Sequence, residues 1–167
     1  LEGESDAAKQ LYNYVRLVAP TTMSVLINGA SGTGKEYVAH RIHQLSKRAG
    51  QPFVAIDCGS IPKELAASEF FGHVKGSFTG ALVGSNKEIT VDVRLVSATN
   101  EDLEQAIEKG TFRQDLFHRI NEFTLRMPEL KDRREDILLF ANFFLDQANR
   151  ELDKQLIGFD DAASRVL

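Results

Sequence analysis

The residues best suited to chemistry form one glycine-rich segment early in the chain. Gly29, Gly34 and Lys35 fit the pattern G-x-x-x-x-G-K. Glycines let the backbone turn tightly, so that successive N–H groups can point at phosphate oxygens, and the lysine adds a mobile positive charge. The segment predicted to bind nucleotide phosphates is Gly29, Ala30, Ser31, Gly32, Thr33, Gly34, Lys35 and Glu36. The alternative is a glycine-rich turn with a surface lysine.

The residue after the lysine departs from the general pattern of such loops. Most loops carry Ser or Thr there, whose hydroxyl holds Mg²⁺, whereas this chain carries Glu36. A carboxylate is a good ligand for a hard cation, although it also repels a triphosphate. Glu36 is therefore the candidate metal ligand. His40 and His43 share a helical face but lack a third ligand, so we expect them to be surface residues.

The segments around this loop must hold it in place, and their patterns predict alternating strands and helices. Residues 24–27 form a short apolar run that indicates a buried strand, and residues 35–47 after the loop indicate a helix. Further strands are expected over residues 52–56 and 91–97, and further helices over residues 6–18, 101–109, 112–119 and 134–150. This alternation predicts an α/β fold, a parallel sheet flanked by helices.

Composition and charge limit the classes of function. The 167 residues are 43% hydrophobic and 26% charged, as expected for one globular domain with a core. The net charge of -4 gives no basic surface for nucleic acid, so we expect DNA contact only through a domain outside this chain. The single cysteine, Cys58, allows no internal disulfide. Because no apolar run reaches membrane length and no signal peptide opens the chain, we expect a cytoplasmic protein without a membrane partner.

Five segments resemble, in the same order, the sigma-54-dependent transcription activators of bacteria, also called enhancer-binding proteins. They are residues 27–36, 69–81, 92–100, 110–121 and 127–137. Glu after the lysine of the phosphate loop, as at Glu36, is usual in that family. The second segment is similar to the family's ELFGHxKGAFTGA, with Phe70 for Leu and Ser77 for Ala. The resemblance extends over nearly the whole chain.

The resemblance implies an AAA+ ATPase domain of the two-component response-regulator type that assembles into a homo-oligomeric ring, usually a hexamer. ATP hydrolysis with Mg²⁺ would then remodel the closed complex of sigma-54 RNA polymerase and activate transcription. The loop tip that contacts sigma-54 would be Gly76, Ser77, Phe78, Thr79, Gly80 and Ala81. Phe78 and Thr79 supply an apolar anchor and a small hydroxyl between flexible glycines. Taken alone, the same segment fits an ordinary hairpin tip.

Three further residues receive roles from the resemblance. Asn100 would be the sensor I residue, which contacts the γ-phosphate or the attacking water, and Arg113 and Arg119 would be arginine fingers. The alternatives are a helix N-cap for Asn100 and an i,i+4 surface pair with Asp115 for Arg119. If both arginines lie on one helix, their spacing places them on different faces, so they cannot share one role without some irregularity.

One element of AAA+ domains is missing from the sequence. It is a strand of apolar residues ending in Asp-Glu, which helps hold Mg²⁺ and polarises the attacking water. In the family this strand lies between the sigma-54 loop and the sensor strand, but residues 81–90 contain no such pattern. We expect a few dozen residues to be missing near residues 82–83, either through disorder, with a chain break beside Leu82, or through deletion. The expected domains are an AAA+ core, residues 1–157, and the start of a truncated helical lid, residues 158–167.

The leading hypothesis is therefore a mechanochemical ATPase that acts on sigma-54. One alternative is a different P-loop NTPase, such as a kinase or a clamp loader, which has no reason to carry residues 76–81. The other is a nucleotide-binding scaffold without hydrolysis, which a true absence of the acidic pair would support. For the same reason, the chain as given is expected to show weak or no turnover.

Overall fold

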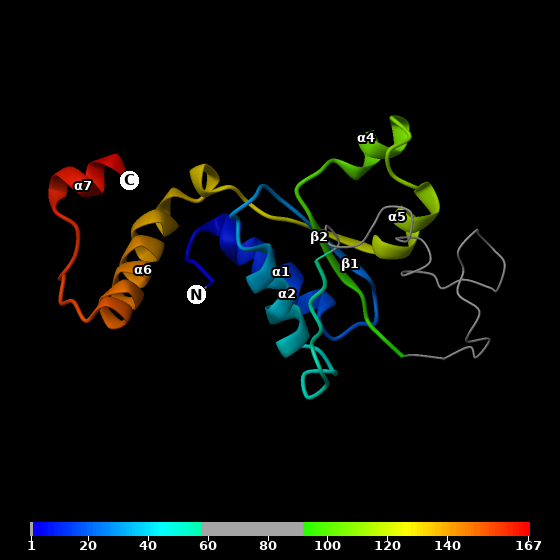
Figure 1. Cartoon of the computed structure of the whole chain (residues 1–167), viewed down its shortest axis with the longest axis horizontal. Coiled ribbons are helices and arrows are strands. Elements are labelled where there is room, and N and C mark those ends of the chain that lie inside the picture. Colours follow the sequence, from blue (N-terminus) through cyan, green and yellow to red (C-terminus); the bar gives the residue numbers. More distant parts are fainter. Residues whose placement is uncertain (1, 58–91) are drawn as a thin grey trace. The chain divides into compact units, whose positions relative to one another are not determined.

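The computed structural model describes residues 2–57 and 92–167. The chain divides into two compact units, Leu1–Gln51 with Arg94–Leu167 and Pro52–Val93, and every described helix and strand belongs to the first (Figure 1). These elements are α1 (Asp6–Val18), β1 (Val25–Asn28), α2 (Lys35–Gln44), β2 (Val96–Thr99), α4 (Leu103–Glu108), α5 (Gln114–Ile120), β3 (Phe123–Arg126), the 3₁₀ turns η2 (Leu130–Asp132) and η3 (Arg134–Asp136), α6 (Ile137–Leu152) and α7 (Asp161–Val166).

The three strands form a parallel sheet in the order β2-β1-β3. In the register of this sheet, Asn28 at the end of β1 pairs with Thr99 of β2 and with Arg126 of β3. The carboxyl ends of all three strands therefore meet at one edge, which is where open α/β sheets bind their ligands. The predicted α/β fold with a parallel sheet is confirmed.

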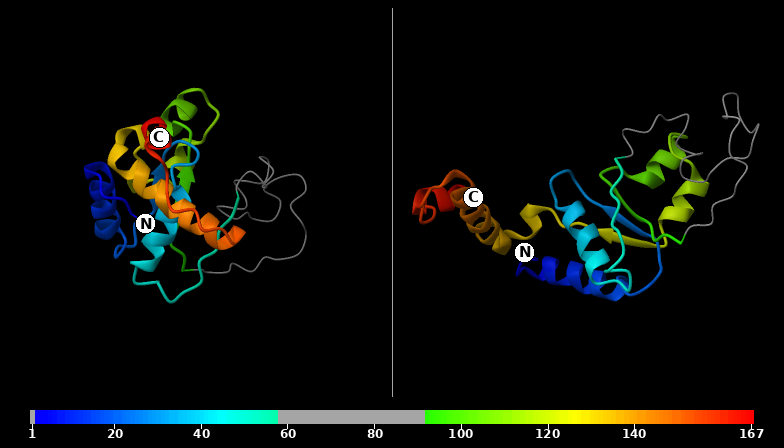
Figure 2. Two further views of the ribbon diagram at one scale, coloured as in Figure 1. Left: turned by 90° about the vertical axis from the view of Figure 1, so that its left-hand side faces the viewer. Right: turned by 60° about the horizontal axis from the view of Figure 1, so that its bottom comes forward.

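Strand β1 is buried on both of its faces. Val25 and Ile27 are fully buried in a core that they share with α1 and α2. Leu26 points to the opposite face, where it packs with Leu103 of α4 and Ile120 of α5. Figures 1 and 2 show α1 and α2 side by side, with α4 and α5 across the sheet from them. Because side chains alternate along a strand, coverage on both faces explains the continuous apolar run in the sequence.

Arg94, just before β2, joins this strand to the end of α1. Its guanidinium donates hydrogen bonds to the carbonyl oxygens of Val18 at 2.9 Å, Ala19 at 2.6 Å and Met23 at 3.1 Å. The last carbonyls of a helix have no partner within the helix and carry partial negative charge. Burial, followed by the nearby Arg48, lowers the pKa of Arg94, but a guanidinium stays protonated in proteins. Arg94 therefore fastens the end of α1 to the sheet.

A buried carboxylate joins the amino-terminal segment to the residues before α6. Asp136 is fully buried and accepts hydrogen bonds from the Ser5 hydroxyl at 2.6 Å, the Glu4 amide at 2.5 Å, the Ser5 amide at 3.0 Å and Arg133 Nε at 2.8 Å. Burial alone would raise the pKa of Asp136, but these donors outweigh burial and hold that pKa well below its usual range. We call Gly3, Glu4, Ser5, Arg133 and Asp136 the Asp136 cluster.

One strand prediction is wrong, and one strand of the sheet is not predicted at all. The strand expected over residues 91–97 is β2, which runs from Val96 to Thr99. Residues 52–56, expected as a strand, have no regular structure, and Val54 and Ile56 are 77% and 65% exposed. Strand β3 is not predicted by the sequence patterns, because only Leu125 of its four residues is buried. The helices form where they are expected, with ends that shift by a few residues; α2, for example, ends at Gln44.

Candidate functional site

The glycine-rich segment is an open loop between β1 and α2. Gly32 and Gly34 have φ angles of 78° and 88°, in the left-handed region that favours glycine. The side chains of Ser31 and the two glycine positions are exposed, and a Cβ atom at Gly32 or Gly34 would meet nothing within 4 Å. The loop is therefore neither extended nor blocked by packed side chains, the two arrangements that would exclude phosphate binding.

Gly29, the first glycine of the loop, is needed for close packing. The Gly29 amide donates a hydrogen bond to the Thr99 carbonyl at 3.1 Å. A Cβ atom at Gly29 would lie 2.5 Å from Cβ of Met127, so a larger residue could not fit between the strands' ends. Gly29 therefore permits close packing at the start of the loop, whereas Gly32 and Gly34 permit its turns.

Lys35 is the first residue of α2 and lies against the loop. Its Nζ donates hydrogen bonds to the carbonyl oxygens of Gly29 at 2.7 Å and Ala30 at 2.8 Å. Thr33 supports the same turn, because its hydroxyl donates to the Ala30 carbonyl at 2.7 Å. The ammonium group therefore lies against the inner side of the loop. The phosphates of a bound nucleotide would compete with these two carbonyl oxygens for its hydrogen bonds.

The amino-terminal end of α2 has free backbone amides that can bind an anion. The N-cap of α2 is Gly34, which has no side chain to accept from the first helical amides. By contrast, the Ser5 hydroxyl caps α1 and the Asp102 carboxylate caps α4, accepting from amides at 3.2 Å and 3.1 Å. Uncapped amides at a helix start, together with the helix dipole, form a phosphate-binding position. Helices α5 and α6 also start without a side-chain cap, so it is the position of α2 directly after the glycine loop that makes its free amides suitable for phosphate.

The candidate metal ligand Glu36 lies in the first turn of α2 with its side chain 85% exposed. Its nearest described basic partner is His40, whose Nε2 lies 3.9 Å from the Glu36 carboxylate. Within residues 2–57 and 92–167, His, Cys, Asp and Glu side chains form no group of three that could hold a metal. Glu36 can therefore offer one carboxylate to a cation that other ligands also hold.

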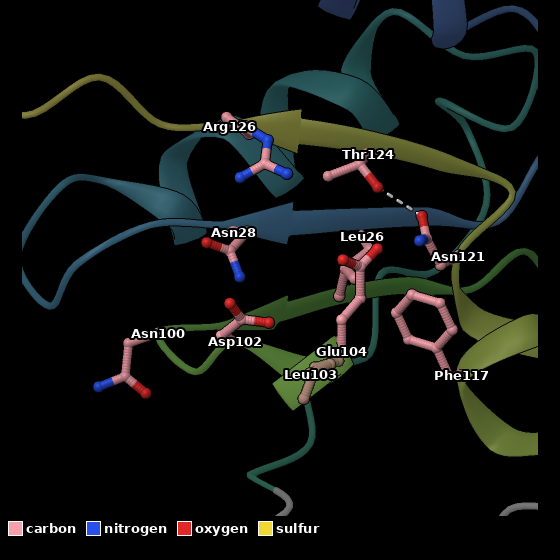
Figure 3. Close-up of a pocket in the computed structure, with 10 residues that line it drawn as sticks. All are labelled: Leu26, Asn28, Asn100, Asp102, Leu103, Glu104, Phe117, Asn121, Thr124 and Arg126. Atoms are coloured by element: carbon pink, nitrogen blue, oxygen red, sulfur yellow. Dashed lines mark hydrogen bonds between the residues drawn. The ribbon is translucent and has the colours of Figure 1, made fainter. Parts of the chain in front are cut away.

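Asn100 follows β2 directly and lies at the same sheet edge as the phosphate loop. Its predecessor Thr99 pairs with Asn28 and accepts the Gly29 amide. The alternative role as a helix N-cap is wrong, because α4 is capped by Asp102. Asn100 is exposed, and its amide points away from the other labelled side chains (Figure 3). The fold thus brings this residue beside the loop and leaves its side chain accessible.

The two candidate arginine fingers do not share a helix, so the condition of the spacing argument is not met. Arg113 precedes α5 as its N-cap residue, with extended backbone, and Arg119 lies in the last turn of α5. Both oxygens of the Asp115 carboxylate accept from Arg113, at 3.0 Å and 2.6 Å, and the hydrogen bond to Arg113 lowers the pKa of Asp115. Arg119 is exposed. The two guanidinium groups therefore lie at opposite ends of α5.

A small pocket of about 220 Å³ lies on the sheet face covered by α4 and α5 (Figure 3). It is lined by Leu26, Asn28, Asn100, Asp102, Leu103, Glu104, Phe117, Asn121, Thr124 and Arg126. The pocket includes Asn28, the residue before the phosphate loop, and none of residues 29–36. Sequence reasoning missed it, although the alternation along β1 places Leu26 and Asn28 on one face.

Some sequence predictions fall on other parts of the chain. Residues 76–81, predicted to contact sigma-54, lie outside the described residues, as does the expected break beside Leu82. In the described part of the chain, no helix combines the length and the apolar character that a membrane span needs.

Comparison with known families covers most of the chain. The model of the Sigma-54 interaction domain matches residues 1–83 and 81–126. The chain belongs to the Sigma-54 interaction domain family. The resemblance stated from five sequence segments is thereby confirmed, and with it an AAA+ domain of the sigma-54-dependent activators.

Relatives of this Sigma-54 interaction domain are transcriptional regulators. The chain is 38% identical to the DNA-binding transcriptional regulator NtrC of Escherichia coli (strain K12) over 192 residues, 90% of the chain and 41% of NtrC. It is 39% identical to the Nif-specific regulatory protein of Sinorhizobium fredii (strain NBRC 101917 / NGR234), covering 99% of the chain and 35% of that protein. The chain thus spans about two fifths of the length of these relatives.

Solved structures show the same fold. A crystal structure of NtrX from Brucella abortus in complex with ADP matches with a TM-score of 0.78 and 34% identity, over 92% of this chain and 43% of that one. Another crystal structure of the same protein matches with a TM-score of 0.83 over 98% of this chain and 46% of that one. These neighbours support the assignment of the parallel sheet and its helices to a nucleotide-binding AAA+ fold.

Proposed function

We propose that this domain binds and hydrolyses ATP and uses the reaction to remodel sigma-54 RNA polymerase, which activates transcription. The observation that carries the nucleotide part is the open glycine loop, with Gly32 and Gly34 in left-handed conformations and Lys35 at the start of an uncapped helix. The ADP and ATP complexes of Brucella NtrX support the choice of ligand. Family membership supports sigma-54 as the partner.

The loop residues would divide the work of holding the nucleotide. The loop amides other than those of Gly29 and Thr33, which donate to carbonyl oxygens of the protein, would face the phosphates, and the Lys35 ammonium would neutralise the β- and γ-phosphates. The exposed Glu36 carboxylate fits a hard cation and would contribute one ligand to Mg²⁺, which stabilises charge on the phosphates when bound. Asn100 would act as the γ-phosphate sensor from the neighbouring strand, because an amide can bond an oxygen or a water without charge.

The remaining roles depend on neighbouring subunits and on other domains. Arg113 and Arg119 are proposed as arginine fingers that reach the nucleotide of an adjacent subunit in a homo-oligomeric ring, usually a hexamer. Residues 76–81 are proposed to contact sigma-54. The regulatory input of a two-component response regulator and the contact with DNA would come from other domains, and the working compartment would be the cytoplasm.

Nucleotide binding is tested by titrating the chain with a fluorescent ATP analogue. Lys35→Ala should weaken binding by about 100-fold or more, since it removes hydrogen bonds to a charged ligand. Lys47→Ala, which changes an exposed lysine beyond the end of the same helix, is the matched control and should bind as the wild type does. Equal affinity of all three proteins would overturn the assignment of the loop.

Contact with sigma-54 is tested by retention on immobilised sigma-54 in the presence of an ATP transition-state analogue. Thr79→Ala should lose retention, and Thr22→Ala, at an exposed threonine in the described part of the chain, should keep it. If both variants are retained like the wild type, residues 76–81 are not the contact loop.

A specific observation favours a second candidate, a nucleotide-binding scaffold without turnover. No Asp-Glu pair ends an apolar strand in residues 81–90. Ninety per cent of the 167-residue chain is about 150 residues, so the 192 residues aligned with NtrC include about 40 without a counterpart here. The two matches to the family model also meet at residues 81–83, which supports a gap at that place. Sequencing the gene across codons 82 and 83 and measuring phosphate release decide between the two candidates.

A further inference from the structure

Asn28, the last residue of β1, connects the phosphate loop to the turn that carries Asn100. Its side-chain Nδ2 donates a hydrogen bond to the Glu101 carbonyl at 2.8 Å. The next residue, Gly29, donates its amide to the Thr99 carbonyl at 3.1 Å. These two bonds reach the residues on either side of Asn100. Asn100 is therefore held between two points that are fixed to the start of the phosphate loop.

The turn around Asn100 is shaped by bonds of its own. The Glu101 amide donates to the Thr99 hydroxyl at 3.1 Å, and Asp102 caps the following helix at 3.1 Å. These bonds fix the form of the turn without setting its distance from the loop. The Asn28 side-chain amide reaches from β1 to the turn after β2, so it acts on that distance directly.

Packing alone does not explain an asparagine at the end of β1. The three preceding residues, Val25, Leu26 and Ile27, are buried apolar side chains. Asn28 continues the face of Leu26, is half-buried and lines the pocket beside α4 and α5 (Figure 3). The Asn28 side chain remains partly open to solvent, and its hydrogen bond to the Glu101 carbonyl replaces the water that half-burial removes.

We propose that Asn28 is a positioning residue that sets the distance between Asn100 and the phosphate-binding loop. The proposal rests on the proposed function, in which Asn100 reads the γ-phosphate. A shift of about 1 Å in a group that must meet a reacting phosphate has a large effect on its contribution. The phosphates shared by ADP and ATP are held by the loop itself, so loss of the Asn28 bond should act on recognition of the third phosphate.

The test measures the affinities of the chain for ADP and for ATPγS by displacement of a fluorescent ADP analogue. Asn28→Asp keeps the shape of the side chain, but an ionised carboxylate cannot donate to the Glu101 carbonyl. Asn100→Ala should lower the ATPγS-to-ADP affinity ratio by about 10-fold, the effect of one hydrogen bond to a charged group. Asn28→Asp should lower the same ratio several-fold while the ADP affinity stays within about two-fold of the wild type.

The double variant separates positioning from an independent contribution. If Asn28 acts through Asn100, Asn28→Asp combined with Asn100→Ala should lower the ratio no further than Asn100→Ala alone, because coupled residues are not additive. Asn28→Ala is the second variant should Asn28→Asp fail to fold, and thermal unfolding of each protein identifies that case.

The matched control makes the same chemical change elsewhere in the pocket. Asn121 accepts from the Thr124 hydroxyl at 2.6 Å, and a carboxylate can accept equally well, so Asn121→Asp should leave the ratio unchanged. The proposal is overturned if neither Asn28 variant changes the ratio while Asn100→Ala does, or if the double variant is additive. If Asn100→Ala has no effect, the sensor role fails together with this proposal. If the wild type binds neither nucleotide, the proposed function fails first.

Discussion

Polar groups are exposed in the phosphate loop, whereas in the Asp136 cluster they are buried and hydrogen-bonded to one another. In the loop, Ala30, Ser31, Gly32 and Gly34 are exposed, and α2 starts without a side-chain cap. In the cluster, a fully buried carboxylate accepts from four donors, and a buried arginine takes part. The first arrangement keeps donors available for a ligand, whereas the second uses its donors within the protein.

The glycines of the two regions show the same contrast. Gly3 and Gly34 both have positive φ angles, 93° and 88°. A Cβ atom at Gly3 would lie 2.6 Å from an oxygen of Asp136, whereas one at Gly34 would meet nothing within 4 Å. Glycine at position 3 is therefore required by backbone and by packing, and glycine at position 34 by backbone alone. A positive φ does not by itself mark a binding site, and neither does open space, since Gly110 combines both outside the phosphate loop.

The comparison is tested most strongly by removing the buried carboxylate. Asp136→Ala should lower the free energy of unfolding by about 3–5 kcal/mol, because it leaves Arg133 buried without its partner. Affinity for nucleotide per folded molecule should not change. Urea unfolding measures the free energy of unfolding. Asp146→Ala, on the exposed side of α6, is the control and should stay within about 0.5 kcal/mol of the wild type. An equal loss in both variants would contradict the role of the cluster.

Protonation of Asp136 should change the free energy of unfolding at acidic pH. The pKa of Asp136 is depressed in the folded state, so its contribution is present above the unfolded pKa of about 3.9 and is lost as pH falls through the folded pKa. The stability difference between wild type and Asp136→Asn should therefore narrow as pH falls from about 5 to about 3. Urea unfolding at each pH measures this difference. A constant difference would mean that Asp136 does not titrate with folding.

Gly3→Ala should destabilise the fold by about 1–3 kcal/mol, because the added methyl group must displace Asp136 or Arg133 from a packed site. Nucleotide affinity should stay that of the wild type. Thermal unfolding with parallel nucleotide titration measures both. Unchanged stability would show that the amino-terminal segment moves freely and that the cluster does not hold it.

Gly34→Ala should cost about 1–2 kcal/mol of stability, the price of a left-handed backbone for a residue with Cβ. In contrast to Gly3→Ala, it should also weaken nucleotide binding, since relief of that strain turns the loop amides away. Gly50→Ala, at a glycine with open space and no positive φ, is the control and should be neutral. If Gly34→Ala binds nucleotide normally, the loop geometry is less demanding than inferred.

Much of the site could be predicted because its signals are local. The loop needs only consecutive residues, and the strand before it and the helix after it are adjacent in the chain. By contrast, the Asp136 cluster joins Ser5 to Asp136, 131 positions away in the sequence, and no local sequence pattern predicts that contact. Strand β3 was missed for a related reason: its membership in the sheet comes from pairing with β1, and one buried residue gives too weak a pattern.

The strand that was wrongly predicted over residues 52–56 shows what local composition cannot predict. Residues 52–56 have the apolar composition of a strand, but composition cannot supply a neighbouring strand for its hydrogen bonds, and in the structure this segment pairs with no described strand. Asn100 shows the intermediate case. Its place beside the loop follows from the parallel register, while the tie from Asn28 could be seen only in three dimensions.

The strand order has a consequence for how the domain folds as it is synthesised. The central strand β1 emerges first, and its partners β2 and β3 begin only at Val96 and Phe123. Pairing of distant segments is slow and leaves apolar surface uncovered in the meantime. Among the described strands, Val25, Leu26 and Ile27 can therefore take their places in the sheet only after most of the chain has been made.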